Sequence, residues 1–289
     1  MQIQRILFPV DFSDSCIGAA RYVAFFAGKF DAEVTLLHAV ATGENNFAAE
    51  LLPGMQARLD GFLESELKYF TTHRVCVAGD PASAIAECAR SWNPDLTIMP
   101  THGLGYFRRH LFGSVTAKTL HDLQCPVWTS VHAETAPALE EIHCLRILCA
   151  VDLGEHSGSI LSWAAWLAGE YQASLAIVHS TARVDLAAAE NLESGRLERE
   201  FQRYVSETAK EEIKALQANA RTEATVFIHP GDPAEIITSA ARDFDADLLV
   251  IGRHNATDLA GLPLQKRARH HAVNAYAIMR ESPCPVISI

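Results

Sequence analysis

The sequence predicts an α/β fold built from two tandem copies of one domain, each an open, parallel, five-stranded sheet flanked by helices. Two observations support this prediction. Short apolar runs of strand length alternate with amphipathic helical stretches along the 289 residues, as is typical of parallel sheets covered on both faces. Similar motifs also recur in the same order in the two halves of the chain, which indicates a duplication.

The repeat consists of five pairs of short motifs. The pairs are Ile6–Asp11 with Ile147–Asp152, Leu36–His38 with Ile177–His179, Gly79–Ala82 with Gly231–Ala234, Asp95–Met99 with Asp247–Ile251, and Cys125–Val127 with Cys284–Val286. A polar, proline-containing stretch between the halves has the composition of a linker. We therefore assign the first domain to residues 1–132 and the second domain to residues 143–289.

In the first copy, turn and cap residues separate the expected elements. Ser13 or Asp14 can cap the first helix, and Asp80 can cap the third, with Pro81 at its first position. The expected strands are Ile6–Val10, Val34–Val40, Arg74–Val77, Leu96–Met99 and Cys125–Val131. The expected helices begin near Ser15, Pro53, Pro81 and Ser114, and the second of them continues to about Phe70.

The second copy repeats this order. Its expected strands are Leu145–Val151, Leu175–His179, Ala224–Ile228, Leu248–Ile251 and Val286–Ile289. Its expected helices include one that carries Ile160 and Leu167, a long charged one over about Asn191–Ala220, and one over Pro233–Phe244. In each copy, a histidine in the second apolar strand (His38 and His179) is expected to be a satisfied core residue.

Composition and charge exclude several classes of protein. The chain has 24 Lys and Arg against 35 Asp and Glu, a net charge of −11, which argues against direct nucleic-acid or anionic-membrane binding. No apolar run is long enough to span a membrane, and the N-terminus lacks a signal-peptide layout. The 7 cysteines are odd in number and lie mostly in apolar patterns, and no export signal is present, so we expect reduced thiols in a cytoplasmic protein. They contain no CxxC pair, and we expect no metal site.

The stretch Asp95–Val131 predicts a strand, a glycine-bearing loop, a helix and a second strand. Gly103 lies in the loop, and Gly113 with Ser114 opens the helix. The first amides of a helix have no partner within it, and the helix dipole favours negative charge there. The stretch therefore predicts either a phosphate cradle or an ordinary strand–loop–helix crossover, and the local pattern does not decide between them.

Both copies resemble the universal stress protein domain. The resemblance rests on ILFPVDFSDSC at the start, LLHAV in the second strand, GDPASAI before the third helix and THGLGYFRRHLFGSV near the end. It implies an adenine-nucleotide hydrolase-like, Rossmann-like fold and, in some members, ATP or AMP binding with Mg²⁺ accompanying ATP. In those members, a glycine, two residues, a second glycine and nine residues precede Gly-Ser or Gly-Thr.

The resemblance implies roles for seven residues of the first copy. Asp11 would accept a hydrogen bond from the adenine, with Pro9 and Val40 packed near the base. Gly103, Gly113, Ser114 and Val115 would hold the phosphates. Pro100 replaces the first glycine of the motif, and a proline has no N–H to offer a phosphate.

The second copy has lost most of this motif. It keeps Asp152 and Gly252, but Asn255 replaces the second glycine and Gln265-Lys266 replaces Gly-Ser. We expect no classical triphosphate site there. A basic cluster follows instead, which could bind an anion or an acidic partner or could be a solvated helix start; it comprises Lys266, Arg267, Arg269, His270 and His271.

The leading hypothesis is a cytoplasmic tandem universal stress protein with a regulatory role in the stress response and nucleotide binding only in the first copy. The two copies are expected to pair through their last strands, Pro126–Val131 and Pro285–Ile289, and two chains could form a homodimer. The alternatives are an interaction scaffold with both sites inactive, a slow ATPase, and a small non-nucleotide ligand in the second copy. No catalytic residues are assigned, because neither a Walker lysine nor a convincing catalytic group is present.

Overall fold

The computed structural model describes residues 1–41, 48–101, 113–182, 192–253 and 275–289. It separates into two compact units. The first unit contains Met1–His143 together with the C-terminal residues Pro285–Ile289, and the second contains the described residues between them. Among the described helices, none combines the length and the apolar character that a membrane span requires.

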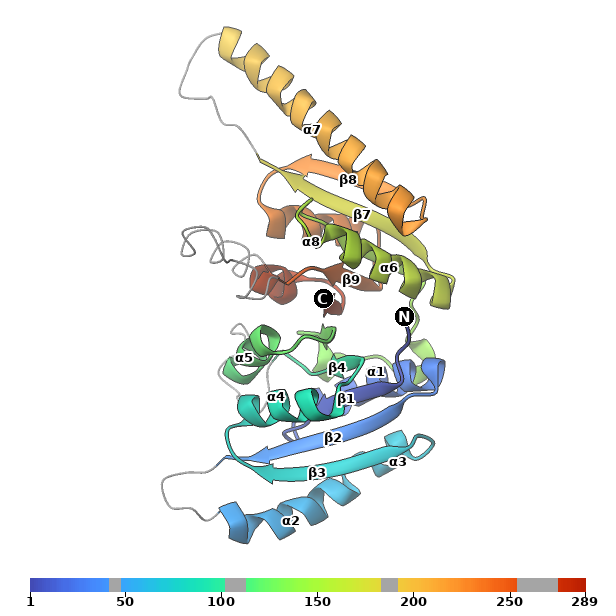
Figure 1. Cartoon of the computed structure of the whole chain (residues 1–289), viewed down its shortest axis with the longest axis vertical. Coiled ribbons are helices and arrows are strands. Elements are labelled where there is room, and N and C mark those ends of the chain that lie inside the picture. The colour runs from blue at the N-terminus through green and yellow to red at the C-terminus, as the bar shows by residue number, and fades with distance from the viewer. Residues whose placement is uncertain (42–47, 102–112, 183–191, 254–274) are drawn as a thin grey trace. The chain divides into compact units, whose positions relative to one another are not determined.

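The first unit is a sheet of strand order β3-β2-β1-β4-β5-β10 (Figure 1). Its strands are parallel except β10, which pairs antiparallel with β5. The strands are β1 (Arg5–Pro9), β2 (Glu33–Val40), β3 (Thr72–Ala78), β4 (Leu96–Ile98), β5 (Val127–Thr129) and β10 (Val286–Ser288). The helices are α1 (Asp14–Phe30), α2 (Ala48–Gly61), α3 (Glu64–Leu67), α4 (Pro81–Trp92) and α5 (Ser114–Asp122).

The second unit repeats this arrangement with the parallel order β9-β6-β7-β8. Its strands are β6 (Arg146–Ala150), β7 (Ser174–Thr181), β8 (Thr225–Pro230) and β9 (Leu248–Ile251). Its helices are α6 (Ser157–Tyr171), α7 (Leu192–Ala220) and α8 (Pro233–Asp243), and residues 275–281 are also helical. Helices flank a mostly parallel sheet, so the fold class predicted from the sequence is confirmed.

An aspartate fixes the start of the central strand in each unit. Asp95 Oδ2 accepts hydrogen bonds from the amides of Gln4 and Arg5, both at 2.9 Å. Asp247 Oδ2 accepts equivalent bonds from Leu145 at 2.8 Å and Arg146 at 2.9 Å. These charge-assisted bonds satisfy backbone donors at the strand entrance and set its register against the neighbouring strand.

The sheets are buried as their apolar sequences require. Ile6, Leu7 and Phe8 of β1 and Ile147 and Leu148 of β6 are all 0% exposed. Both strand histidines are satisfied, as expected, because His38 Nδ1 and His179 Nδ1 each lie 2.8 Å from a backbone oxygen, that of Val10 and Val151 respectively. The expected caps are also confirmed, since Ser13 caps α1 and Asp80 caps α4.

The single helix expected over Pro53–Phe70 is wrong. The chain forms α2 and the short α3 instead, with Pro53 inside α2 and a break at Leu63, whose φ is +56°. Gln56 explains the position of α2, because its side chain accepts from the Cys76 amide at 3.0 Å and donates to the Arg74 carbonyl at 3.2 Å. These two bonds satisfy backbone groups at the free edge of β3, which would otherwise be open to pairing with another strand.

The segment expected to be a linker packs closely against α1. It forms two short 3₁₀ turns, Ala133–Thr135 and Leu139–Glu141. Ser15 Oγ donates to Glu134 Oε1 at 3.0 Å, and Arg21 Nη1 donates to the carbonyls of Ala136 and Pro137. Gly18 faces this segment, and a Cβ added there would lie 1.7 Å from the Ala133 oxygen.

We therefore expect Gly18→Ala to lower the free energy of unfolding by about 1–2 kcal/mol, since the clash must displace the linker segment. Chemical denaturation measures this change. Gly28→Ala is the matched control in the same helix, because its nearest contact would be Phe70 Cε1 at 3.7 Å. Equal stability of the two variants would contradict the close packing at Gly18.

Candidate functional site

The strand order of the first unit reverses between β1 and β4, which are neighbours in the sheet. In open α/β sheets, ligands bind beyond the carboxyl ends of the strands at such a reversal. Three of the predicted residues lie at this edge. Pro9 ends β1, Asp11 follows it, and Val40, only 8% exposed, ends β2.

Asp11 is held by a local turn. Its Oδ1 accepts from the Ser13 amide at 3.1 Å and from the Cys16 thiol at 3.2 Å. The second unit has the same arrangement, in which Asp152 Oδ1 accepts from the Gly154 amide at 2.8 Å and from Ser157 Oγ at 2.9 Å. Each aspartate therefore presents an oriented carboxylate at the edge of its sheet.

An aromatic cluster that the sequence analysis did not identify lies beside Asp11. Phe12 has φ +65°, and its ring centroid lies 4.5 Å from that of His38 and 5.0 Å from that of Phe62. The Arg58 guanidinium lies 4.0 Å from the centre of the same ring. The Phe that follows Asp11 in the sequence was the available signal, but its left-handed conformation could not be anticipated from residue type.

Helix α5 begins at the same edge. Gly113 is its N-cap and supplies no side-chain acceptor, Ser114 is exposed, and Val115 is half-buried. The Gly113 amide donates to the Thr101 carbonyl at 2.9 Å, and Thr116 Oγ1 donates to the Pro100 carbonyl at 3.2 Å. Of the predicted site residues, Gly103 lies outside the described part of the chain.

The second unit contains a cavity of 240 Å³ at the equivalent edge, where β6, β7 and β9 end. Asp152, His179 and Ser180 provide its polar groups. A Cβ added at Gly252 would lie 2.5 Å from Ile160 Cδ1, so the end of the Ile160 side chain would have to shift. The apolar lining residues are Ala150, Val151, Ile160, Pro233, Ile237, Ile251, Ala275 and Ile278.

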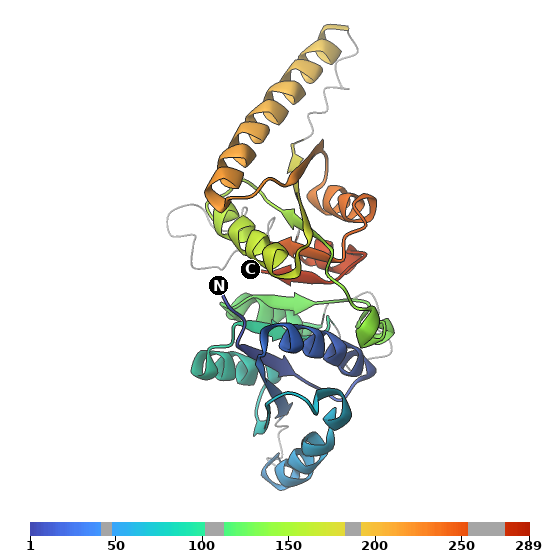
Figure 2. The same ribbon diagram turned by 90° about the vertical axis from the view of Figure 1, so that its right-hand side faces the viewer.

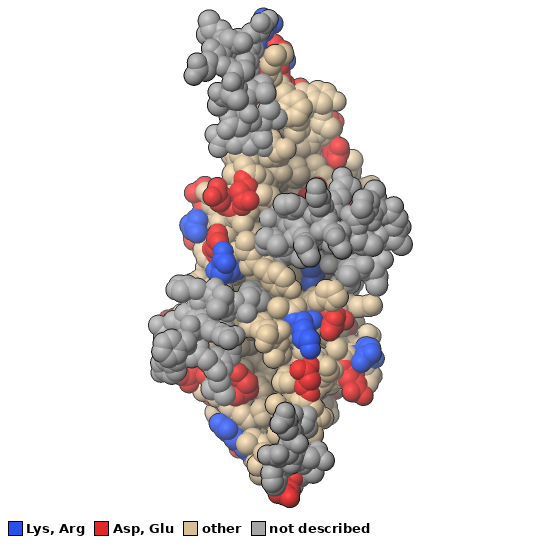
Figure 3. Space-filling view, turned by 90° about the vertical axis from the view of Figure 1, so that its left-hand side faces the viewer, with Lys and Arg blue, Asp and Glu red and all other residues tan. Residues whose placement is uncertain are grey.

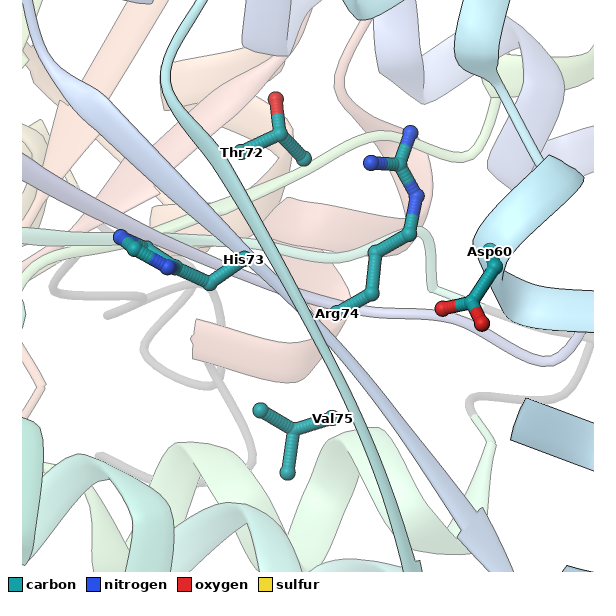
Figure 4. Close-up of a pocket in the computed structure, with 5 residues that line it drawn as sticks. All are labelled: Asp60, Thr72, His73, Arg74 and Val75. Carbon is teal, nitrogen blue, oxygen red and sulfur yellow. The ribbon is translucent and has the colours of Figure 1, made fainter. Parts of the chain in front are cut away.

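A separate hollow lies along β3 of the first unit (Figure 4). Two of its charged groups, Asp60 and Arg74, form hydrogen bonds to residues in α2 and just after it. Asp60 Oδ1 accepts from Gln56 Nε2 at 2.7 Å, and Arg74 Nη2 donates to the Phe62 carbonyl at 3.4 Å. The hollow is therefore a seam between two elements, and its residues form no catalytic arrangement.

On one face of the molecule, the described charged side chains are of mixed sign (Figure 3). On the face drawn in Figure 3, the described Lys and Arg side chains are interspersed with Asp and Glu. Within the described ranges, no group of three or more His, Cys, Asp and Glu side chains could hold a metal ion.

Comparison with known proteins identifies related chains. The model of the universal stress protein family matches residues 2–130 and 144–289. A universal stress protein of Methanocaldococcus jannaschii is 31% identical over 135 residues, which are 43% of this chain and 79% of that protein.

Two solved structures resemble the whole chain in fold. A universal stress protein from Archaeoglobus fulgidus has a TM-score of 0.70 at 19% identity, covering 99% of this chain and 96% of that one. A functionally unknown Pseudomonas aeruginosa protein has a TM-score of 0.64 at 19% identity, covering 99% and 92%.

The environment of Cys16 leads to a prediction about thiol reactivity. Burial, with a smaller contribution from Asp11, raises the pKa of Cys16 to about 12, and burial raises the pKa of Cys149 to about 12. Both thiols stay protonated at pH 8, and the thiolate is the reactive form. Iodoacetamide should therefore label the half-buried Cys76, Cys88 and Cys125 before the buried thiols. Peptide mass spectrometry would contradict this if Cys16 reacted as fast as Cys76.

Proposed function

Because the chain belongs to the universal stress protein family, with two copies of the family domain in tandem, we propose that it is a regulatory protein of the stress response whose first domain binds ATP or AMP. The start of α5 carries this proposal. A glycine cap and an exposed Ser114 lie at the edge where β1 ends in an oriented Asp11 carboxylate. Such an edge suits a ligand with a hydrogen-bonding base and an anionic tail.

In this proposal, each part of the nucleotide has its own contacts. Asp11 accepts a hydrogen bond from the adenine amino group, while Pro9 and Val40 pack against the base. The amides of Ser114 and Val115, the Ser114 hydroxyl and the loop at Gly103 bind phosphate, and Mg²⁺ accompanies ATP. Since the Gly113 amide already donates to Thr101, Gly113 contributes by leaving room for the phosphate.

We also propose a cytoplasmic location and pairing of the two domains through their last strands. All seven cysteines are free thiols, as suits a reducing compartment. The antiparallel register of β10 with β5, in which Val286 lies opposite Thr129 and Ser288 opposite Val127, supports the pairing. This pairing would cover a strand edge that would otherwise be exposed.

A nucleotide-independent scaffold is the competing function, and one observation favours it. Pro100 occupies the first glycine position of the nucleotide motif and has no amide hydrogen to donate. A slow ATPase has less support, because no general base or metal ligand set accompanies the nucleotide residues among the described side chains.

Isothermal titration of ATP and AMP with Mg²⁺ tests the proposed nucleotide site. We expect saturable binding at one site per chain and its loss in Gly113→Asp, which places a carboxylate where the phosphate would lie. Gly113 has φ −62° and ψ 138°, and aspartate is a favourable N-cap, so the variant should keep its fold. No binding to the wild-type chain would support the scaffold instead.

Asp11→Asn and Asp152→Asn form a matched pair for the base contact. Both retain Oδ1 as an acceptor for the local turn, remove the charge and replace the acceptor Oδ2 with an amide NH2 that donates. We expect Asp11→Asn to weaken AMP binding by about tenfold, the effect of roughly 1.4 kcal/mol, and Asp152→Asn to leave it unchanged. Equal effects of the two substitutions would contradict a site confined to the first domain.

The cavity of the second domain favours a second, separate candidate function. Its volume of 240 Å³ is below the range of about 300–1,000 Å³ of most ligand pockets. Its walls are mostly apolar, with a carboxylate at one side. We propose that it binds a compact, uncharged ligand that donates a hydrogen bond to Asp152.

Phenol, a compact and uncharged hydrogen-bond donor, is a suitable probe of this cavity. We expect saturation-transfer NMR to detect phenol binding that disappears when Ala275→Trp fills the cavity. Signal that persists in the Ala275→Trp variant would contradict binding at this position.

A further inference from the structure

Helix α7 has two distinct apolar faces. The first packs against α6, β7 and β8 of its own unit. On this face, Ala209 is 4% and Ile213 is 1% exposed, and Gln202 Nε2 donates to Thr181 Oγ1 at 2.9 Å. These contacts hold the helix to its domain. The N-terminal half of α7 extends beyond the sheet of that domain (Figures 1 and 2).

The second face is an exposed stripe in that N-terminal half. It consists of Leu197, Phe201 and Tyr204, which are 57%, 45% and 68% exposed. Their spacing of four and then three residues aligns them along the helix, and at 3.6 residues per turn the stripe lies roughly 130° from Ala209 and Ile213. The same spacing forms the seam of helix pairs in coiled coils.

Charged residues of alternating sign run along one flank of this stripe. In chain order they are Arg196, Glu200, Arg203 and Glu207, all exposed. Within the helix, Arg196 Nε lies 3.0 Å from Glu200 Oε1, and Arg203 Nε lies 4.0 Å from Glu207 Oε1. Read in the opposite direction along the helix, this order of charges is negative, positive, negative, positive. Two antiparallel copies of the flank therefore place opposite charges against each other.

We propose that the α7 stripe binds the same stripe of a second copy of this chain, with the two helices antiparallel. Aligning Phe201 of one chain with Tyr204 of the other joins the aromatic residues into one apolar layer. The same register brings Arg196 near Glu207 and Glu200 near Arg203 of the second copy. In a parallel, in-register pair, the two copies of this flank would lie on opposite sides of the apolar layer and could not pair with each other.

The size of the stripe determines the strength of this association. Three large side chains on a short helical segment bury less area than a standard protein interface, which indicates a reversible, concentration-dependent dimer. Aromatic residues at the centre of an interface carry most of its binding energy. Phe201 and Tyr204 are therefore the positions at which substitution should matter most.

Sedimentation velocity over a concentration series tests the proposal. We expect the wild-type chain to dimerise and Phe201→Glu to weaken dimerisation by more than about tenfold. Tyr69→Glu is the matched control, because Tyr69 is an aromatic residue of the first unit that is 82% exposed. A wild-type chain that stays monomeric at all concentrations, or a dimer insensitive to Phe201→Glu, would overturn the proposal.

Charge variants test the flank separately. Arg196→Glu with Arg203→Glu makes the flank wholly acidic, and Glu200→Arg with Glu207→Arg makes it wholly basic. Each double variant alone should be monomeric, whereas an equimolar mixture should form a heterodimer. Circular dichroism confirms that α7 remains helical. If the double variants dimerise alone as well as the wild type does, the helices do not pair through this flank.

Discussion

The reversal of strand order beside the first strand of each domain is the constraint on which the rest of the structure depends. It leaves the carboxyl ends of two adjacent parallel strands without a crossing connection above them, and both candidate sites lie there. The hydrogen bonds that Asp95 and Asp247 accept fix the start of that first strand in each domain. Asp11 and Asp152 form the turns that follow its end. Both copies of the domain therefore hold the two ends of this strand with the same kinds of aspartate contact.

The two copies differ in the groups that lie at this edge of the sheet. The first copy has a glycine-capped helix and an aromatic cluster next to its aspartate, both suited to an anion joined to a planar base. The second has a mostly apolar cavity, with Ile160 and Gly252 among its lining residues. Its α7 also carries an exposed apolar stripe. The second copy thus combines a mostly apolar cavity with the exposed stripe of α7.

The sequence predicted the fold well because its signals are strong and local. Buried strands such as Ile6–Val10 are continuous apolar runs, and the caps Ser13 and Asp80 have the side chains that a helix start requires. The break at Leu63 was missed because it depends on the tertiary bonds that Gln56 makes to β3. Of the predicted site residues, Asp11 and Ser114 lie at the expected edge of the sheet. The packing of Phe12 on Phe62 and Arg58 was not predicted, because it joins residues distant in sequence.

Amide hydrogen exchange with and without Mg-ATP tests the central claim, a nucleotide site in the first domain alone, most directly. The account predicts slower exchange in two segments of the first domain when ATP is present: the turn after Asp11 and the first turn of α5. It predicts no change in the equivalent turn after Asp152. Unchanged exchange throughout the first domain, or protection confined to the second, would contradict it.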